Sequence, residues 1–274
     1  MNTDLSFFVP ISRLFQTRFQ NPHWDRYPEV EKNQVEAVCL FLGAYAFERQ
    51  GRNPSYAHAA VTAIEEARIC LYPGPNFKGV VRDKFSQSLQ GQKLNWKNSP
   101  LAHNDGNGCD CVWCVFDGES LISAAKQSLL NGEVKPIWEG LQRIRGVGPK
   151  IPSFFLRDLA VRYGLTPKKE DRHLLQPVDV WVRRTVQWLA NKNKMTEAEV
   201  AKWIVSHSGE PELANQGIWY FGAQIAQSEL RLFEALRSRK YAKMLIEDHF
   251  KALKATVAAA EHWLHCGTSQ APSR

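Results

Sequence analysis

A lysine follows two glycines and a proline in Gly146-Val-Gly-Pro-Lys150, between two segments with helical apolar spacing. Glycine permits positive φ and leaves no side chain between the backbone and a ligand, so the amides of such a turn can bind a phosphate. Lys150 would begin the second helix, where the helix dipole disfavours a protonated amine, and partial burial would disfavour it further. From this position alone, a phosphate contact or an ordinary solvated lysine is favoured over a nucleophilic lysine, which the position also permits.

Asp179 is the second candidate, and it lies just before an apolar-periodic helix. Aspartate is a favoured helix N-cap, and this role alone would explain its position. The glycine-rich turn, the lysine and the later sequence Pro177-Val-Asp-Val together resemble the helix-hairpin-helix DNA glycosylases. The match is closest to the 8-oxoguanine DNA glycosylase/AP lyases, with endonuclease III next. The specific part of the resemblance covers about residues 137 to 189.

The resemblance implies an all-α, two-lobed fold and an enzyme that flips a damaged base out of double-stranded DNA. Asp179 would stabilise the cationic sugar as the base leaves and help to activate the nucleophile. Neutral Lys150 would attack C1′ and form a Schiff base that permits strand nicking. No cofactor is needed for this chemistry. We expect 8-oxoguanine first, while oxidised pyrimidines, mismatched bases and modified foreign DNA stay open.

The same resemblance assigns DNA contacts. The backbone of Gly146, Val147 and Gly148 would bind a phosphate without reading sequence. Relatives often carry a histidine two residues after the aspartate, where this chain has Trp181, so Arg183 or Arg184 would replace that contact. The link between the lysine and the aspartate has 28 residues, longer than is usual in the family, with the extra length in the charged stretch 165 to 176.

Residues 219 to 229 resemble the helix that supplies base-pocket residues in 8-oxoguanine glycosylases. Gln224 would lie at a base edge, where an amide can both donate and accept. Phe221 or Trp219 would stack on the flipped base. The alternatives are core positions for the two aromatic side chains and a surface or packing role for the amide.

Three of the six cysteines cluster in one stretch, with a histidine nearby, and these residue types suit zinc: Cys109, Cys111, Cys114 and His103. Their spacing is not that of paired CxxC motifs, so a structural zinc and reduced cysteines packed in a loop are both open. Near the C-terminus only Cys266 is found. We therefore expect no iron–sulfur cluster of the kind that endonuclease III relatives carry in a cysteine-rich C-terminal loop.

The bulk composition bounds the class of protein. The chain has 274 residues and a formal net charge of +7, which suits a polyanionic partner. No apolar run approaches the roughly 20 residues of a membrane span. The first 15 residues lack the basic start of a signal peptide. We expect an intracellular, monomeric protein that binds double-stranded DNA and no membrane.

Helical apolar spacing recurs along the chain and no strand alternation is found, so the sequence predicts an all-α class. We expect residues 1–118 with 226–274 to form one lobe, residues 119–225 the helix-hairpin-helix lobe, and residues 267–274 a disordered tail. Residues 73–118 are rich in Gly, Asn, Pro and Asp and predict irregular structure. The expected helices span residues 33–50, 55–72, 120–130, 133–144, 151–164, 180–190, 196–208, 216–238 and 241–264.

Three rival functions are open at this stage. A monofunctional glycosylase of the same fold would use Lys150 only to grip phosphate. A non-catalytic DNA-binding protein would use the hairpin alone, but Asp179 beside the DNA backbone would weaken its binding by repulsion. A structural protein that uses the hairpin for protein contacts fits the net charge of +7 less well.

Overall fold

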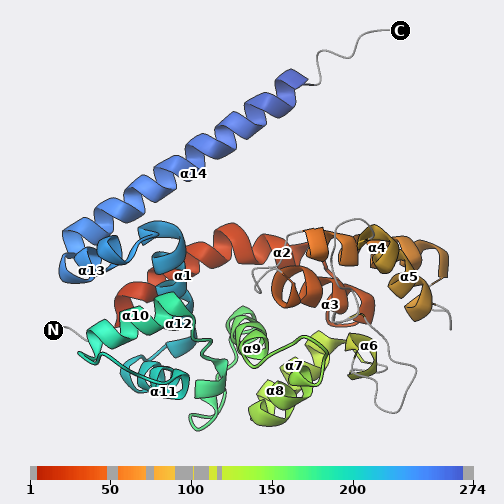
Figure 1. Cartoon of the computed structure of the whole chain (residues 1–274), viewed down its shortest axis with the longest axis horizontal. Helices are drawn as coiled ribbons and strands as arrows, with labels where there is room; N and C mark the ends of the chain where they lie inside the picture. Colours follow the sequence, from red (N-terminus) through yellow and green to blue (C-terminus); the bar gives the residue numbers. More distant parts are fainter. Residues whose placement is uncertain are drawn as a thin grey trace.

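The structure is a computed structural model, and it describes residues 5–47, 55–71, 77–89, 101, 111–115 and 119–267. These residues form helices and turns and no strand (Figure 1), which confirms the all-α class. In this part of the chain, no helix has the length and apolar character needed to cross a membrane. The α-helices are α1 (Phe8–Phe15), α2 (Asn21–Asp25), α3 (Gln34–Phe41), α4 (Ser55–Leu71), α5 (Phe77–Leu89), α6 (Val112–Val115), α7 (Leu121–Leu130), α8 (Val134–Gln142), α9 (Lys150–Arg162), α10 (Val180–Leu189), α11 (Glu197–His207), α12 (Pro211–Tyr220), α13 (Glu229–Arg237) and α14 (Arg239–Gly267).

Short tighter and wider helical turns complete the fold. The 3₁₀ turns are η1 (Leu5–Phe7) and η6 (Arg172–Leu175). Within the described ranges three segments are π-helical: η2 (Gln16–Gln20), η3 (Leu42–Ala46) and η7 (Phe221–Ala226). The backbone stays right-handed helical through both ends of η2, so α1, η2 and α2 form one continuous helical run.

Buried apolar side chains form two cores. The first core draws on residues 24–175, and the second core draws on residues 5–15 and 178–245. The run from α1 to α2 crosses between them, because Phe8 and Phe15 belong to the second core and Trp24 to the first (Figure 1). This grouping differs from the predicted lobes: the buried apolar side chains of residues 119–175 belong to the core of the N-terminal half, and those of residues 178–225 belong to the second core.

A buried polar network joins the two cores. The side chains of Arg157 and Asp158 on α9 are fully buried, and Arg157 Nε and Nη2 donate to Asp158 Oδ1 at 2.8 and 2.6 Å. Arg157 Nη1 donates to Asn215 Oδ1 on α12 at 2.8 Å, and Asn215 Nδ2 donates to the carbonyl oxygen of Pro177 at 3.1 Å. The network therefore fixes α9 against α12 and against the segment that leads into α10.

Several predicted elements differ from the structure. The long helix expected over residues 216–238 breaks after η7, where Gln227 takes a left-handed conformation (φ +60°) and Ser228 caps α13 by accepting from Arg231 N. Apolar spacing continues across this break, which hides it in the sequence. The helical run over residues 8–25 was not expected. Residues 268–274 of the predicted tail lie outside the described residues.

The stretch predicted to be irregular contains α5. Its apolar residues Val81, Phe85 and Leu89 recur every four positions and are all buried. The Phe85 ring packs against Phe47 and Tyr56, with ring centroids 6.0 and 6.3 Å away. The prediction was wrong for residues 77–89 because the polar composition of the wider stretch outweighed this periodicity.

Gly217 lets α12 lie directly against α1. A Cβ atom at this position would lie 2.7 Å from the carbonyl carbon of Phe8 and closer still to its oxygen. Both of these are backbone atoms, so the contact cannot be relieved by a side-chain rotation. The approach of the two helices thus depends on the absence of a side chain at residue 217.

We expect Gly217→Ala to lower the free energy of unfolding by about 1–3 kcal/mol, the usual cost of overpacking. Urea denaturation followed by circular dichroism measures it. The control is Gly209→Ala, because a Cβ there would meet no atom within 4 Å. Equal stability of the two variants would show that α1 and α12 can separate without cost.

Candidate active site

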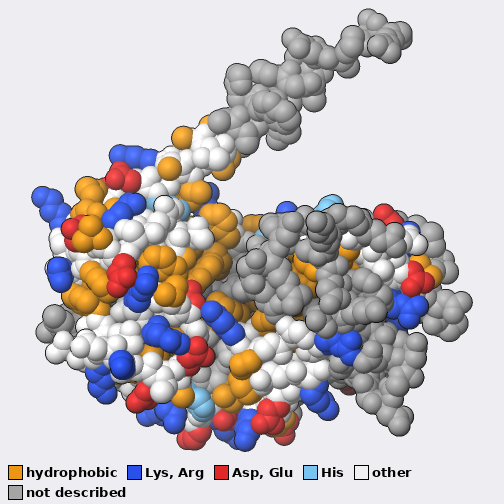
Figure 2. Space-filling model, viewed as in Figure 1, with side chains coloured by type: hydrophobic (Ala, Val, Ile, Leu, Met, Phe, Trp, Pro, Cys, Tyr) orange, Lys and Arg blue, Asp and Glu red, His pale blue; other side chains and the backbone are white. Residues whose placement is uncertain are grey.

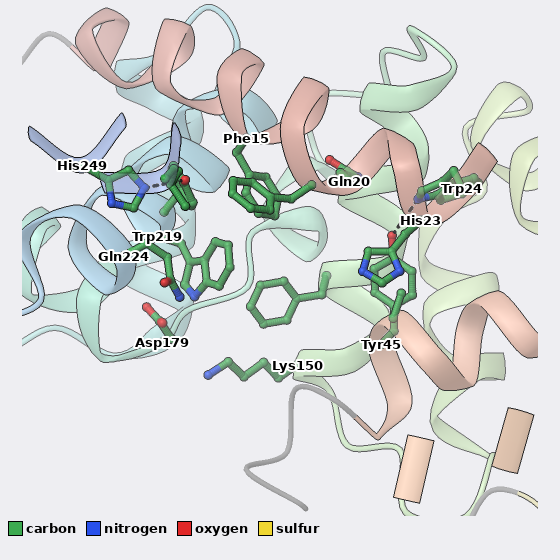
Figure 3. A pocket seen from close by; sticks show the side chains of 15 residues that line it. Phe15, Gln20, His23, Trp24, Tyr45, Lys150, Asp179, Trp219, Gln224 and His249 are labelled. Atoms are coloured by element: carbon green, nitrogen blue, oxygen red, sulfur yellow. Dashed lines mark hydrogen bonds between the residues drawn. The ribbon is translucent and has the colours of Figure 1, made fainter. Parts of the chain in front are cut away.

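A pocket of about 560 Å³ lies between the two cores (Figure 3). Its volume falls within the roughly 300–1,000 Å³ typical of small-molecule sites. Side chains from both ends and the middle of the chain line it: Phe15, Phe19, Gln20, His23, Trp24, Ala44, Tyr45, Lys150, Phe154, Asp179, Trp219, Tyr220, Gln224, His249 and Leu253. Lys150 and Asp179 thus share one pocket.

Lys150 is the first residue of α9, directly after the turn at residues 143–149, as the sequence predicts. Gly146 in this turn has φ +76°. The Lys150 side chain is exposed, so the expected partial burial is not observed in the free protein. Its ammonium group lies 5.9 Å from the centroid of the Phe154 ring. In Figure 3 the Lys150 amine extends toward the side of the pocket that holds Asp179.

Asp179 caps a helix, as the sequence predicts, and it also lines the pocket. It is the N-cap of α10: its backbone is extended, and Oδ1 accepts from Val182 N at 2.8 Å. The side chain is half-buried and lines the pocket. The cap uses one carboxylate oxygen and leaves the other outside this hydrogen bond.

Of the two aromatic residues predicted to stack on a base, Trp219 lines the pocket and Phe221 does not. Trp219 lines the pocket and packs edge-to-face on Phe15 and Phe154, at centroid distances of 5.3 and 6.4 Å. Phe221 is fully buried in the second core, against Phe8 at 6.1 Å, and does not line the pocket. The core alternative therefore holds for Phe221. Phe154 was missed, although its position four residues after Lys150 places it on the same helix face.

Gln224 lines the pocket from η7, and its side chain is exposed. Gln227 Nε2 donates to the Gln224 backbone oxygen at 2.9 Å. Two positions earlier, Gly222 lets η7 approach α10 closely, since a Cβ there would lie 2.8 Å from the Cβ of Trp181. Trp181 thus packs beneath η7, and the guanidinium of Arg184 lies 5.8 Å from its ring centroid.

The residues of the turn before α9 differ in how accessible their backbone is to a phosphate. Val147 is buried in the first core, and its amide donates to Ile144 O at 3.0 Å within the turn. Gly148 is exposed and faces open space, since an added Cβ would meet no atom within 4 Å. Of the two glycines expected to permit positive φ, only Gly146 adopts it. Gly148 therefore leaves open space beside the backbone just before α9.

Arg183 and Arg184 already have carboxylate partners. Arg183 Nη2 lies 2.7 Å from Glu197 Oε1 on α11, and Arg184 Nη2 lies 3.2 Å from Glu229 Oε2 on α13. Lysine and arginine side chains are spread among acidic ones on the face that Figure 2 shows, rather than gathered in one patch. Contact with a phosphate would require either arginine to leave or share its carboxylate.

Helix α14 closes one side of the pocket with His249, which sequence reasoning missed. The Tyr220 hydroxyl and His249 Nε2 are hydrogen-bonded at 2.9 Å. Burial raises the pKa of Tyr220 to about 12 and lowers the pKa of His249 below its ordinary value. Both side chains are therefore neutral near pH 7. Nothing in the sequence near residue 249 indicated a site.

The three π-helical segments of the described chain all contribute to the pocket. Phe19 and Gln20 come from η2, Ala44 and Tyr45 from η3, and Gln224 from η7. A π-turn inserts an extra residue and rotates the following side chains, and such turns are frequent at functional sites. The helices on both sides of the pocket are thus locally widened where they face it.

The predicted metal site falls mostly outside the described residues, which exclude Cys109, His103 and the side chain of Cys114. Cys111 is buried. Among the residues that the structure describes, no group of three or more His, Cys, Asp or Glu side chains is placed to hold a metal ion. The zinc prediction therefore stays a prediction.

We expect Asp179→Ala to lower the free energy of unfolding by about 1 kcal/mol, because the N-cap of α10 is lost. Asp179→Asn should change stability by only a few tenths of that amount, since an amide oxygen still caps the helix. Urea denaturation of both variants checks this. If the alanine variant is as stable as the asparagine variant, the cap does not hold α10.

Comparison with known proteins adds little to this geometry. A curated protein similar to the chain is the uncharacterized protein MJECL21 of Methanocaldococcus jannaschii, 33% identical over 207 residues. The match covers 67% of this chain and 48% of the relative, so the chain spans about half the length of that protein. No family model matches the chain, and no solved structure matches it.

Proposed function

We propose that the chain is a DNA glycosylase with AP lyase activity, built on the two-lobed helix-hairpin-helix fold of that superfamily. The carrying observation is that Lys150 and Asp179 line one pocket between the two cores. A lysine at a helix start and a carboxylate across an aromatic cavity supply a nucleophile and a stabiliser of positive charge. A protein that only binds DNA has no need for this pair.

The pocket suits a flipped nucleotide. Its walls are mainly aromatic: the Phe154 ring lies 5.9 Å from the Lys150 ammonium group, and Trp219 lies on the same side of the pocket as Asp179 (Figure 3). Flipped bases are held by stacking on such side chains and by hydrogen bonds to their edges. Gln224 supplies an amide at the rim that can both donate and accept. These features support a base-excising enzyme over the structural protein considered as a rival.

The reaction follows from the two groups. Asp179, with one oxygen engaged in the cap, stabilises the cationic sugar as the bond from C1′ to the base breaks. The neutral Lys150 amine forms a bond to C1′, and the base leaves with a proton. Opening of the sugar ring gives a Schiff base. Loss of a C2′ proton then expels the 3′ phosphate, and water releases the lysine.

The turn before α9 anchors the DNA backbone in this proposal. Gly148 leaves the approach to the α9 N-terminus open, where backbone amides and the helix dipole favour a phosphate. The partner is double-stranded DNA with a damaged or modified base, 8-oxoguanine first, bound by a monomer inside the cell. The net charge of +7 is compatible with such a partner.

We expect borohydride to trap a covalent complex between the wild-type chain and duplex DNA with an abasic site or the preferred lesion. Lys150→Gln should abolish trapping and nicking, because the attacking amine is gone. Asp179→Asn should lower base release by on the order of 10²–10³-fold, the cost of removing a preorganised stabiliser. Duplexes with single lesions, scored separately for base release and nicking, measure both.

The control is Lys202→Gln, which removes an exposed lysine of α11 that does not line the pocket. Base release without trapping in the wild-type chain would point to the monofunctional alternative. Binding without base release from any lesion would leave the non-catalytic DNA-binding protein. Full trapping by Lys150→Gln would remove Lys150 as the nucleophile.

We expect Gly148→Val to weaken binding to damaged and undamaged duplex equally, by about tenfold, the size of one charge-assisted hydrogen bond. The fold should stay intact, because the side chain would point into open space. Fluorescence anisotropy at moderate salt measures affinity, with Gly209→Val as the control. Undiminished affinity for undamaged DNA would show that this turn is not the anchor.

A further inference from the structure

In the side-chain amide of Gln20, the oxygen has a hydrogen-bond partner and the nitrogen has none. It is the last residue of η2, it lines the pocket, and only 7% of it is exposed. Its Oε1 accepts from Gln216 Nε2 at 2.8 Å. Its Nε2 is buried and has no hydrogen-bond partner. A buried amide nitrogen without an acceptor is costly, so its persistence at a pocket wall points to a missing acceptor.

The orientation of this amide is fixed by a chain of hydrogen bonds that starts at Asp158. The Asp158 carboxylate is paired with the Arg157 guanidinium and can only accept. It accepts from Gln216 Nε2 at 3.0 Å, so the Gln216 nitrogen must face Asp158 and Gln20. Gln16 Nε2 donates to the other end of the Gln216 amide, its oxygen, at 2.9 Å.

The polarity of Gln20 follows from this chain. Since the Gln216 nitrogen donates to it, Gln20 must turn its oxygen toward Gln216 and its nitrogen away. A flipped Gln20 amide would set two N–H groups against each other. Amide orientations are often interchangeable, but here the acceptor-only carboxylate at the start of the chain removes the choice. The end of the Gln20 amide that lacks a partner is therefore its donor, not its acceptor.

We propose that Gln20 is a specificity-determining residue whose amide N–H donates to a keto oxygen of the base held in the pocket. This proposal rests on the proposed function. If the base carried an amino group at that position, this amino group and the Gln20 amide would both be donors. Binding of such a base is therefore disfavoured. The nitrogen is covered in the free protein, so the base must displace a neighbouring side chain to reach it. The pocket thus favours oxo bases over their amino counterparts.

The test compares 8-oxoguanine with 8-aminoguanine in the same duplex, together with a bare abasic site. Gln20→Glu keeps an oxygen for Gln216 Nε2 and replaces the donor with an acceptor. We expect it to lower release of 8-oxoguanine by roughly tenfold to a hundredfold. Release of 8-aminoguanine should fall less or rise, so the ratio of the two rates changes. Nicking of abasic DNA should stay within about twofold, because no base is recognised there.

Two further variants keep the test decisive. Gln87→Glu on α5 adds the same charge away from the pocket and should change no rate. Gln20→Met removes the donor without adding charge and should show the same selective loss on the oxo base. Equal loss on lesion and abasic DNA, or no loss in either Gln20 variant, would overturn the role of Gln20. A wild-type chain that neither releases a base nor nicks abasic DNA would instead overturn the proposed function and this inference with it.

Discussion

The ion pair between Arg157 and Asp158 is the constraint on which the rest of the structure depends. Both side chains are fully buried between the two cores, and removal of one partner from such a pair costs roughly 3–5 kcal/mol. Through Asn215 the pair is linked to the carbonyl group of Pro177, two residues before Asp179. The helix that begins at Lys150 is the helix that carries the pair. One buried network thus sets the positions of Lys150 and Asp179 together.

Close packing in the second core positions the pocket wall that contains Trp219 and Gln224. Gly217 lets α12 contact the backbone of α1, and Gly222 lets η7 contact α10. These approaches place Trp219 and Gln224 across the pocket from Lys150. Larger residues at either glycine would push the helices apart and open the wall. The shape of the pocket therefore depends on backbone proximity as much as on the side chains that line it.

The sequence predicted the features that are determined locally. The turn with Gly146, the helix start at Lys150 and the cap at Asp179 each depend on a few adjacent residues, and each is found as expected. The contributions of Gln20 and His249 were missed, because the packing of η2 and α14 brings them to the pocket from distant parts of the chain. The π-turns were also missed, since apolar spacing does not reveal one inserted residue. The predicted lobes also differ from the two cores, because contacts between helices that are distant in the sequence set this division.

The hydrogen bonds that join Arg157, Asp158, Gln216 and Gln20 also fix which end of the Gln20 amide could contact a bound base. Asp158 is paired with Arg157 and accepts from Gln216, so Gln20 turns its oxygen toward Gln216 and its nitrogen away. The donor at the pocket wall is therefore fixed by the same carboxylate that stabilises the contact between the cores. A substitution of Gln20 that presents an acceptor to the base would still need an oxygen that accepts from Gln216. Only a carboxylate of the same length meets both demands, so the proposed specificity of Gln20 is coupled to stability through one chain of hydrogen bonds.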